Sequence, residues 1–302
     1  MLNELIIVRY GEIGLKAKET KRRFENTLIQ NIKKALKSKN IYIEIKKERG
    51  RIFIHTNKIN SSIDILKKIF GIVSISPAVK TNENINSISD LSIKIIEENL
   101  ENKNSFALRV RRTGDHTYNS QEVAIKVGND IVKKTNLKVD LTNPDIELFI
   151  EIRDKDTYIY KKKIKCVKGL PLGTQGNILA LINNKNSILA AWYMMKRGCK
   201  PIFFVTNNKI IETLKIFIKK WYAEEKIITN KSDENKYKAI KKIVKNYKCQ
   251  ALITNHNIYQ SKSVIKQLKT LKNQIEIPVF YPLISLEKKE IDNKIKEIGL
   301  TS

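Results

Sequence analysis

The first 77 residues alternate between short apolar runs, which predict strands, and stretches with apolar side chains at three- and four-residue spacing, which predict amphipathic helices. In chain order these are residues 5–9 (strand), 21–36 (helix), 41–45 and 52–55 (strands), 63–70 (helix) and 72–75 (strand). The order strand, helix, two strands, helix, strand is the ferredoxin-like pattern. We therefore expect an N-terminal ferredoxin-like domain over residues 1–77, closed by Pro77.

A second mixed α/β region follows, and we expect it to form a separate domain over residues 78–170. Helices are predicted at 89–100 and 120–135, with Ser120 as N-cap of the second, and strands at 106–110, 139–141, 145–152 and 157–160. Residues 169–176 contain three glycines in eight positions and predict a linker.

From residue 177 onward, apolar strands alternate with helices. Strands are predicted at 178–182, 201–205, 251–254 and 279–281, and helices at 187–196, 210–222, 236–247, 259–271 and 287–298. Apolar strands separated by helices are typical of a parallel, doubly wound sheet covered on both faces. The expected fold is thus α/β and α+β, with a doubly wound C-terminal domain over residues 171–302.

The net charge of the chain indicates what kind of partner it binds. The chain has 58 Lys and Arg against 31 Asp and Glu, a formal net charge of +27. Self-repulsion of this size disfavours the compact state, so it indicates a polyanionic partner, with nucleic acid favoured. Two alternatives stay open: the excess is largely lysine and can reflect the composition of a whole proteome, and a basic surface also suits acidic membranes.

Cysteine and histidine usage predicts neither disulfides nor a metal site. Cys166, Cys199 and Cys249 are widely spaced and form no CxxC pair, and the three histidines lie far apart. No stretch approaches the roughly 20 apolar residues of a membrane span, and the chain enters its first strand without an apolar leader. We expect a reduced, cytoplasmic protein in which Cys199 is a core thiol, while the lysines beside Cys166 favour a lowered thiol pKa.

The densest positive feature is the segment Arg109-Val110-Arg111-Arg112. In a strand, Arg109 and Arg111 share one face, and Arg112 is expected to lead into a loop. Guanidinium groups bind phosphate oxygens in a bidentate manner. The alternative is a strand edge that its charges protect from pairing.

Two further basic clusters, around residues 9–23 and 161–165, favour nucleic acid over edge protection. Several cations on one surface give affinity with a steep salt dependence, because each neutralised phosphate releases counterions. Tyr118 and Tyr160 are candidates for stacking on unpaired bases, although aromatic residues on strands are more often part of the core. The predicted RNA-binding residues are Arg9, Lys16, Lys18, Arg22, Arg109, Arg111, Arg112, Lys161, Lys162 and Lys168.

Nine segments, in order along nearly the whole chain, resemble the tRNA 4-thiouridine synthetase (tRNA sulfurtransferase) family. They are residues 9–16 (RYGEIGLK), 109–112 (RVRR), 120–122 (SQE), 139–141 (VDL), 143–146 (NPDI), 169–176 (GLPLGTQG), 194–199 (MMKRGC), 251–254 (ALIT) and 279–284 (VFYPLI). The resemblance implies a ferredoxin-like domain, a THUMP domain that grips the tRNA acceptor end, and a PP-loop domain. That last domain would activate a tRNA uridine with ATP before a cysteine supplies the sulfur.

The phosphate loop of the family departs from its S-G-G-x-D-S pattern here. Glycines let backbone N–H groups approach phosphates, but this chain has Asn183 and Asn184 in their place, Asn186 for the aspartate, and a retained Ser187. Asparagine tolerates a positive φ better than most residues but still carries a Cβ. The family's later Gly-Glu and Gln positions read Asn255, His256 and Gln260, its Arg-Pro-Leu-Ile reads Tyr281-Pro282-Leu283-Ile284, and its catalytic cysteine would lie beyond Ser302.

We therefore expect a tRNA-binding member of this family that cannot adenylate tRNA by itself, with no catalytic residue and no cofactor. Its sheet domain would serve as a scaffold, as a contact in a possible homodimer, or as a platform for a partner. The alternative is a tRNA sulfurtransferase or other tRNA-modifying enzyme, using ATP alone or with a catalytic partner. A third interpretation is a basic assembly protein without preference for tRNA.

Overall fold

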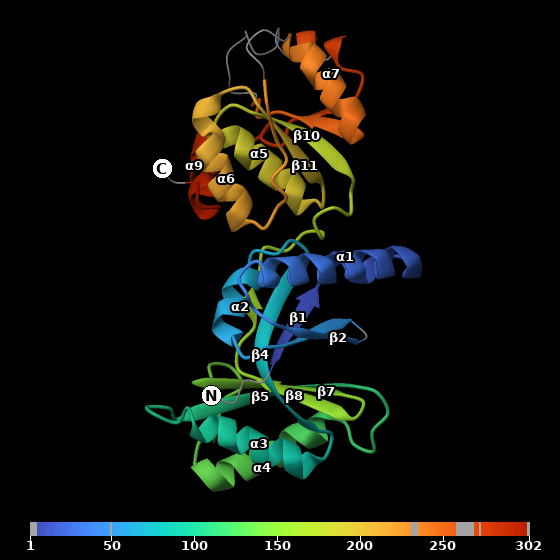
Figure 1. The fold of residues 1–302 in the computed structure, drawn as a ribbon. Helices are drawn as coiled ribbons and strands as arrows, with labels where there is room; N and C mark the ends of the chain where they lie inside the picture. Colours follow the sequence, from blue (N-terminus) through green and yellow to red (C-terminus); the bar gives the residue numbers. More distant parts are fainter. Residues whose placement is uncertain (1–4, 49, 231–234, 258–268, 272, 301–302) are drawn as a thin grey trace. The chain divides into compact units, whose positions relative to one another are not determined.

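The computed structural model describes residues 5–48, 50–230, 235–257, 269–271 and 273–300. The helix predicted at 259–271, and Gln260 with it, falls largely outside these ranges. The chain divides into two compact units, each considered by itself (Figure 1). The first unit comprises Met1–Arg9, Leu36–Lys67 and Val73–Cys166, and the second comprises Tyr10–Ala35, Lys68–Ile72 and Val167–Ser302.

One continuous sheet of nine strands organises the first unit, in the order β2-β3-β1-β4-β8-β7-β5-β6, with β9 also paired to β4. The strands are β1 (Leu5–Tyr10), β2 (Glu44–Glu48), β3 (Arg51–His55), β4 (Ile72–Asn82), β5 (Ser105–Thr113), β6 (Lys138–Val139), β7 (Ile146–Arg153), β8 (Asp156–Tyr160) and β9 (Ile164–Lys165). The helices that alternate with them are α2 (Ile59–Leu66), α3 (Ile85–Glu97) and α4 (Ser120–Thr135). With α1 (Lys18–Lys37), the first elements follow the predicted order βαββαβ.

The two faces of this sheet carry different cores. On one face, α3 and α4 pack apolar side chains such as Ile96 and Val127 against Phe106, Leu148 and Ile150 (Figure 1). On the other, a smaller cluster joins the aromatic residues of β8 to the strands near the N-terminus. Its members are Leu5, Ile7, Phe53, Ala78, Tyr158 and Tyr160, with Phe149 packed beside them.

Strand β4 is longer than predicted and does not end at Pro77. It pairs with β9 at Ser74 and Ile75 and with β8 from Val79 onward. Proline has no backbone N–H for a sheet ladder, and Pro77 sits where the strand changes partner. The ends of several other elements also differ from prediction. The strand predicted at 41–45 is β2, at 44–48, the helix predicted at 63–70 is α2, at 59–66, and the helix predicted at 89–100 is α3, at 85–97.

The predicted ends of β2 and α2 were wrong because Ile41 and Phe70 are buried outside these two elements. Ile41 donates its backbone N–H to Leu36 O after a turn at Asn40, so it packs at the end of α1 instead of entering a strand. Phe70 lies beyond α2 and belongs to the core of the second unit, where its ring stacks on Trp221.

The second unit contains a parallel sheet of five strands in the order β12-β11-β10-β13-β14, as expected for a doubly wound fold. Its strands are β10 (Asn177–Ile182), β11 (Lys200–Val205), β12 (Ile227–Thr229), β13 (Cys249–Ile253) and β14 (Val279–Phe280). Its further helices are α5 (Lys185–Lys196), α6 (Ile211–Lys220), α7 (Lys236–Tyr247) and α9 (Lys288–Glu297), with short 3₁₀ helices at Glu12–Leu15 and Asn208–Ile210.

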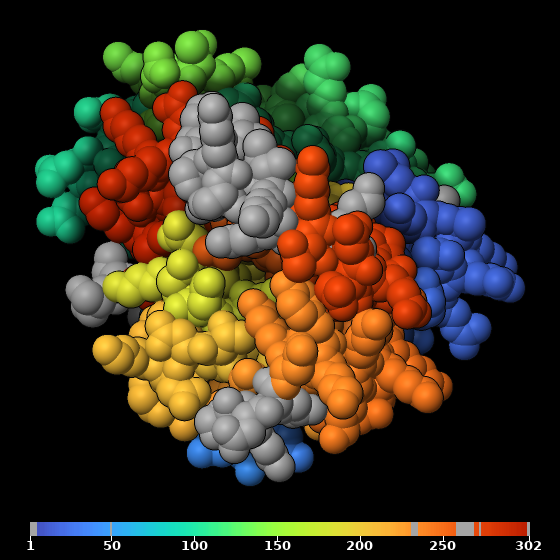
Figure 2. Space-filling view, turned by 90° about the horizontal axis from the view of Figure 1, so that it is seen from above, coloured from blue at the N-terminus to red at the C-terminus, as the bar shows by residue number. Residues whose placement is uncertain are grey.

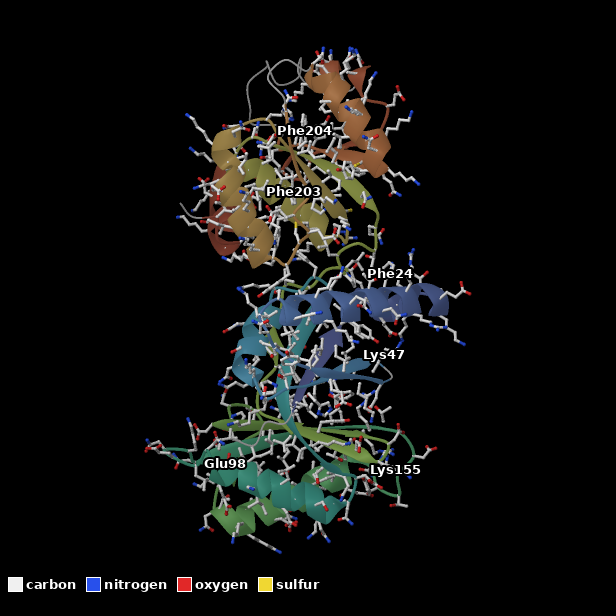
Figure 3. The ribbon with its side chains drawn as sticks, in the orientation of Figure 1. Phe24, Lys47, Glu98, Lys155, Phe203 and Phe204 are labelled. Atoms are coloured by element: carbon white, nitrogen blue, oxygen red, sulfur yellow. The ribbon has the colours of Figure 1, made fainter. Side chains whose placement is uncertain are left out.

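Alternation along the strands divides this core into two clusters. Successive side chains of a strand point to opposite faces, so Phe203 packs with α5, α6 and α9, whereas Phe204 packs with α7 (Figure 3). Figure 2 shows the yellow, orange and red segments of this region side by side at its surface. The predicted doubly wound sheet is confirmed.

Candidate nucleic-acid interface and nucleotide loop

Strand β5 carries the arginine cluster along a largely open edge. Residues Phe106 to Thr113 pair in parallel with β7, whereas on the other side β6 pairs only with Ser105 and Phe106. Within the described part of the chain, the outer edge of β5 beyond Phe106 therefore has no neighbouring strand. Arg112 lies inside the strand, so the prediction that it begins a loop is wrong, because Ile152 of β7 continues the pairing beside it.

The arginines of β5 differ in how many hydrogen bonds and ion pairs their side chains form within the protein. Arg109 is held by Glu147, with Nε donating to Oε1 over 2.7 Å, and by Leu141 O, which accepts from Nη2 over 2.8 Å. Arg112 donates from Nη1 to Gly114 O over 2.9 Å. Arg111 is exposed and, among the described residues, pairs with no carboxylate. It is therefore the arginine of this strand best placed to bind an anion.

Lys163 adds a second cation to this edge, and no carboxylate among the described residues forms an ion pair with it. Its Nζ lies 3.8 Å from the centre of the Phe149 ring, and Phe149 is the β7 residue opposite Arg109. Burial and the nearby charge of Arg111 both lower the pKa of Lys163, so a positive potential is already present at this site. Lys163 was not among the predicted contacts, although it stands in the lysine run at 161–165.

A groove of about 450 Å³ runs between the open edge of β5 and the start of α4, and we call it the β5 groove. Its charged and polar lining comes from Arg109, Arg111, Lys163, Ser120, Gln121 and Glu147, of which Glu147 is paired with Arg109. The partial positive charge of a helix N-terminus favours anions, so the strand and the helix present charge of the same sign to this space.

The N-cap of α4 is Asn119 and not the predicted Ser120, whereas the helix spans Ser120–Thr135 as predicted. Asn119 has an extended backbone, and its side chain accepts hydrogen bonds from the N–H groups of Gln121 and Glu122. Glu122 in turn accepts from Asn119 N, which completes a capping box. Ser120 and Gln121 are thereby fixed in the first turn, beside the groove.

A buried ionic cluster surrounds Glu151 of β7. It includes Arg9, so Arg9 is no longer a candidate RNA contact. Glu151, with a side chain 6% exposed, lies 3.3 Å from Arg9 Nη2, 2.9 Å from Arg51 Nε and 3.1 Å from Arg153 Nη1. Burial alone would raise the pKa of Glu151, but the charges of Arg51, Arg9 and Arg153 outweigh it and the pKa is lowered. Arg9, 12% exposed, also donates to Ser76 Oγ over 2.9 Å.

Tyr160 is part of the same interior, so the core alternative holds for this residue and base stacking does not. Its side chain is buried, its ring stacks on Phe149, and the Arg9 guanidinium lies 4.7 Å from its centre. The N-terminal strands cover it through the cluster that contains Leu5 and Ile7. Tyr118 is half-buried, and its hydroxyl donates to Glu83 O.

The other predicted contacts lie elsewhere on the two units. Lys161 and Lys162 line a second hollow of about 310 Å³ in the first unit, where Lys161 Nζ donates to Asn99 Oδ1. The remaining candidates belong to the second unit and are exposed: Lys16, Lys18, Arg22 and Lys168. The β5 groove thus gathers Arg109 and Arg111 but none of the other predicted cations.

The loop at residues 183–187 connects β10 to α5 at the carboxyl edge of the parallel sheet. Asn183 N and Asn184 N both donate to Ser187 Oγ, over 3.0 and 3.2 Å, and Ser187 N donates to Asn184 Oδ1 over 3.0 Å. Asn184 is the N-cap of α5, with an extended backbone at φ −158°, and Ser187 is buried. Three backbone donors are therefore engaged within the loop itself.

Two neighbouring asparagines bind the same loop from the sides. Asn207 Nδ2 donates to Asn183 O, and Asn255 Nδ2 donates to Asn184 Oδ1, each over 3.1 Å. Asn255 follows β13, so its bond to Asn184 crosses the space between the ends of β10 and β13. In doubly wound sheets, this reversal of strand order is where ligands bind. The backbone N–H groups of Asn183, Asn184 and Ser187 are thus bonded to side chains of the loop itself.

The cysteines lack the environment of a nucleophile. Burial raises the pKa of the Cys166 thiol to about 12 and that of Cys249 to about 11. The prediction that lysines lower the pKa of Cys166 is wrong, because burial outweighs the charge of Lys67. Cys199 is buried in the core, as predicted.

Three family descriptions match successive parts of the chain: the ThiI ferredoxin-like domain at residues 5–76, the THUMP domain at 82–161, and Thiamine biosynthesis protein (ThiI) at 223–302. Fold and site together thus define a THUMP protein with a ferredoxin-like start and a ThiI-type α/β region.

Curated relatives and solved structures agree over nearly the whole chain. The probable tRNA sulfurtransferases of Methanobrevibacter smithii and Thermococcus kodakarensis are 33% and 32% identical, over 98% of this chain and 86% and 87% of their own lengths. PH1313 from Pyrococcus horikoshii matches with a TM-score of 0.86 and 30% identity, over 98% of this chain and 99% of its own. A 4-thiouridine synthetase in complex with RNA and bound ATP matches with a TM-score of 0.83 and 27% identity, over 98% and 85%. The chain belongs to the tRNA sulfurtransferase family, as its motifs predicted.

The helices were also compared with the length and apolarity that a membrane span requires. In the part of the chain that the structure describes, none is both long and apolar enough to cross a bilayer.

Proposed function

We propose that this protein binds tRNA and that the unpaired end of the acceptor arm lies in the β5 groove. The observation that carries the proposal is the groove itself, in which an open strand edge and a helix N-terminus flank Arg111 and Lys163, two cations that pair with no carboxylate among the described residues. Sequence-specific RNA recognition favours unpaired segments, whose base edges are accessible. The THUMP match and relatives named as tRNA sulfurtransferases support tRNA as the RNA.

Each residue of the groove has a separate part in this proposal. Arg111 and Lys163 bind phosphates, Arg109 is oriented by Glu147 to shape the edge, and Ser120 and Gln121 offer hydrogen bonds to base edges. The other predicted cations contribute long-range attraction: Lys16, Lys18, Arg22, Arg112, Lys161, Lys162 and Lys168. Arg9 is omitted because Glu151 holds it inside the first unit.

We also propose that the chain does not adenylate tRNA through its 183–187 loop. In support, the backbone donors at Asn183, Asn184 and Ser187 are already bonded within the loop, and Asn255 bridges the site. The predicted three-domain division at residues 77 and 170 is retained in this proposal, as is the possible homodimer.

Filter binding across a salt series tests RNA binding through the β5 groove. We expect Arg111→Ala/Lys163→Ala to weaken tRNA binding and to reduce the slope of log K against log salt by about 1.4, since each lost phosphate contact on a single strand contributes about 0.7. The control is Lys133→Ala/Lys134→Ala at the far end of α4, which removes the same charge. An unchanged slope in the first variant, or an equal change in the control, would contradict the assignment.

A second candidate function is tRNA sulfurtransferase activity with ATP as co-substrate, favoured by the similarity to such enzymes over 98% of the chain. Isothermal titration with ATP separates the two proposals. A saturable heat that Ser187→Ala abolishes would place an ATP site at this loop, favour the enzyme and overturn the proposal of a closed loop. Absence of heat, with tRNA binding intact, favours the binding protein.

A further inference from the structure

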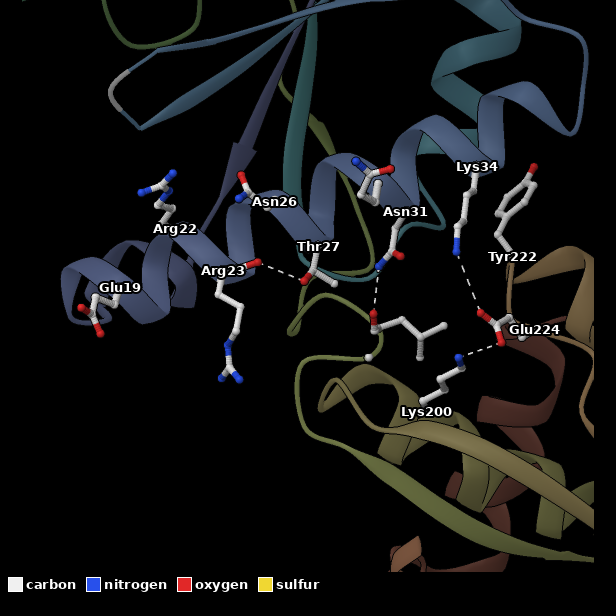
Figure 4. A pocket seen from close by; sticks show the side chains of 13 residues that line it. Glu19, Arg22, Arg23, Asn26, Thr27, Asn31, Lys34, Lys200, Tyr222 and Glu224 are labelled. Carbon is white, nitrogen blue, oxygen red and sulfur yellow. Dashed lines mark hydrogen bonds and ion pairs between the residues drawn. The ribbon is translucent and has the colours of Figure 1, made fainter. Parts of the chain in front are cut away.

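Two hollows of the protein, one in each unit, differ in what lines them. The larger, of about 750 Å³, lies along α1 in the second unit, and charged groups of both signs line it, among them Glu19, Arg22 and Glu224 (Figure 4). The smaller, of about 310 Å³, lies in the first unit and combines aliphatic side chains with two lysines. We call this smaller hollow the β4 pocket, because Pro77 of β4 lines it.

The β4 pocket forms where β4 changes its partner strand. Ser74 and Ile75 pair with β9, whereas Val79 and the residues after it pair with β8, so the connection at 161–163 crosses from β8 to β9 near Pro77. Helix α2 and the end of α3 supply the remaining walls. The pocket therefore lies where the ferredoxin-like and THUMP parts of the first unit join in one sheet.

Aliphatic side chains form the floor of the β4 pocket. Val79, Ile95 and Ile159 are buried members of the core that α3 and α4 cover, while Ile63 and Ile164 are half-buried. Transfer of an apolar group from water to such a surface is favourable. An aliphatic chain in this pocket would cover apolar surface that the fold leaves partly open to water.

Two lysines make the rim of the pocket positive. Lys161 Nζ donates to Asn99 Oδ1, a neutral acceptor, and Lys162 is exposed. Among the described residues, no carboxylate forms an ion pair with either lysine. Glu98, the C-cap of α3, also lines the pocket, but the two lysines exceed its single charge. Burial and the charge of Lys162 lower the pKa of Lys161 against the opposing effect of Glu98, so a bound anion would stabilise its charged form.

We propose that the β4 pocket binds a small aliphatic carboxylate, with the chain on the isoleucine floor and the carboxylate beside Lys161 and Lys162. Ligand pockets range from about 300 to 1,000 Å³, so the volume of this one restricts the ligand to a small molecule. Hydrogen bonds from an ammonium group to a carboxylate are among the strong ones. This site is separate from the β5 groove and does not depend on the proposed tRNA binding.

The lining favours such a carboxylate over RNA and over a cation. Unpaired bases stack on aromatic rings, but the ring of Tyr160, which also lines the pocket, is stacked on Phe149 at a centroid distance of 5.2 Å. A phosphate backbone would contact the lysines and leave the aliphatic floor open to water. An ammonium ligand would meet the like charges of Lys161 and Lys162.

Methyl NMR of isoleucine-labelled protein tests the proposal with three probes. Octanoate and octylammonium share a chain and differ in charge, and acetate has the head group without the chain. Signals of Ile63 and Ile164 are assigned from Ile63→Val and Ile164→Val. We expect octanoate to shift both signals saturably and to bind about tenfold more tightly than octylammonium, because only its charge is opposite to that of the rim. Acetate should give no saturable shift.

Charge reversal at the rim should reverse this preference. Lys161→Glu/Lys162→Glu keeps the aliphatic floor, so we expect it to bind octylammonium more tightly than octanoate. The matched control is Lys133→Glu/Lys134→Glu at the far end of α4, which should keep the original preference. Because a ligand that binds only the folded state raises the Tm, octanoate should raise the Tm of the unsubstituted and control proteins but not of the rim variant. Melting curves without probe establish that both variants are folded.

Three results overturn the proposal: no saturable shift at Ile63 and Ile164, equal binding of octanoate and octylammonium by the unsubstituted protein, or a loss of preference in the control equal to that in the rim variant. Shifts of equal size at isoleucines throughout the protein would show unspecific association and would overturn it as well. Filter binding of tRNA is measured separately, and its failure bears on the proposed function alone.

Discussion

Helices α4 and α5 start in the same way but in different surroundings. Each begins with an asparagine, Asn119 or Asn184, whose side chain accepts backbone hydrogen bonds within a capping box. Around the start of α4 stand Arg109, Arg111 and Lys163. Around the start of α5, the side chains that bond to the loop are the amides of Asn207 and Asn255.

The difference shows that a helix N-terminus alone does not make an anion site. A capping box uses the first backbone donors in both helices, so the remaining preference for an anion depends on what neighbouring strands supply. Strand β5 supplies cations at α4, and strands β11 and β13 lead to neutral amides at α5. The contrast is between a helix start that is flanked by cations and one that is flanked by neutral amides, and four experiments probe these regions of the protein.

The largest expected effect is on the stability of the protein, through the buried Glu151 of β7. We expect Glu151→Gln to lower the free energy of unfolding by about 3–5 kcal/mol, because three arginines lose the carboxylate that compensates their burial. Urea denaturation measures the change. The matched control is Glu147→Gln, which removes a half-exposed partner of Arg109 and should cost below about 1 kcal/mol. Equal effects of the two substitutions would contradict a central role for Glu151.

The same carboxylate should make the stability of the protein depend on acid pH. Its pKa is lower in the folded protein than in the unfolded chain, where a glutamate has a value of about 4.3. The stabilisation is therefore complete above that value and is lost as pH falls toward the folded pKa. Denaturation curves between neutral and acid pH should fall more steeply for the unsubstituted protein than for Glu151→Gln. Parallel curves would exclude Glu151 as a source of the acid dependence.

A smaller effect is expected on ATP binding at the start of α5, when the loop at residues 183–187 is changed toward the family's glycine-rich pattern. Asn183→Gly/Asn184→Gly/Asn186→Asp removes the cap and the bond to Asn255, and it restores flexible backbone and the missing carboxylate. We expect equilibrium dialysis to detect ATP binding at least tenfold tighter than in the unsubstituted protein. Because replacing an N-cap asparagine by glycine costs only a few tenths of a kcal/mol, the fold should persist. Tight binding of ATP before substitution would remove the contrast between α4 and α5.

The smallest effect concerns the cysteines. With a pKa raised to about 12, Cys166 is thiolate in roughly one molecule in ten thousand at pH 8. We expect mass spectrometry to find it unmodified by iodoacetamide in the native protein, during a time that labels it fully in urea. Rapid native labelling would instead assign it an accessible, reactive environment.

Local patterns in the sequence were sufficient to predict the helices and strands whose buried residues recur with a clear period. The parallel sheet followed from apolar strands such as β10 alternating with helices, and helix α7 matches its predicted bounds, Lys236–Tyr247. The arginines of β5 were identified because they adjoin in sequence. Strands β9 and β12, with two and three residues, are too short for any period to show.

Long-range pairing explains most of what the sequence left hidden. The role of Arg9 depends on Glu151, 142 positions away, and nothing near either residue predicts that contact. Likewise, the glycine replacements at Asn183 and Asn184 were visible, but the bridge from Asn255, 71 positions further on, was not.

Strand β4 has a practical consequence for dissecting this protein. It pairs with β9 before Pro77 and with β8 after it, and it joins β1 to β8 in the order of the sheet. A fragment that starts at residue 78 would keep the segment that pairs with β8 but lose the segment that pairs with β9. We therefore expect a THUMP fragment to require all of β4, from Ile72, and the first unit to melt in one cooperative step.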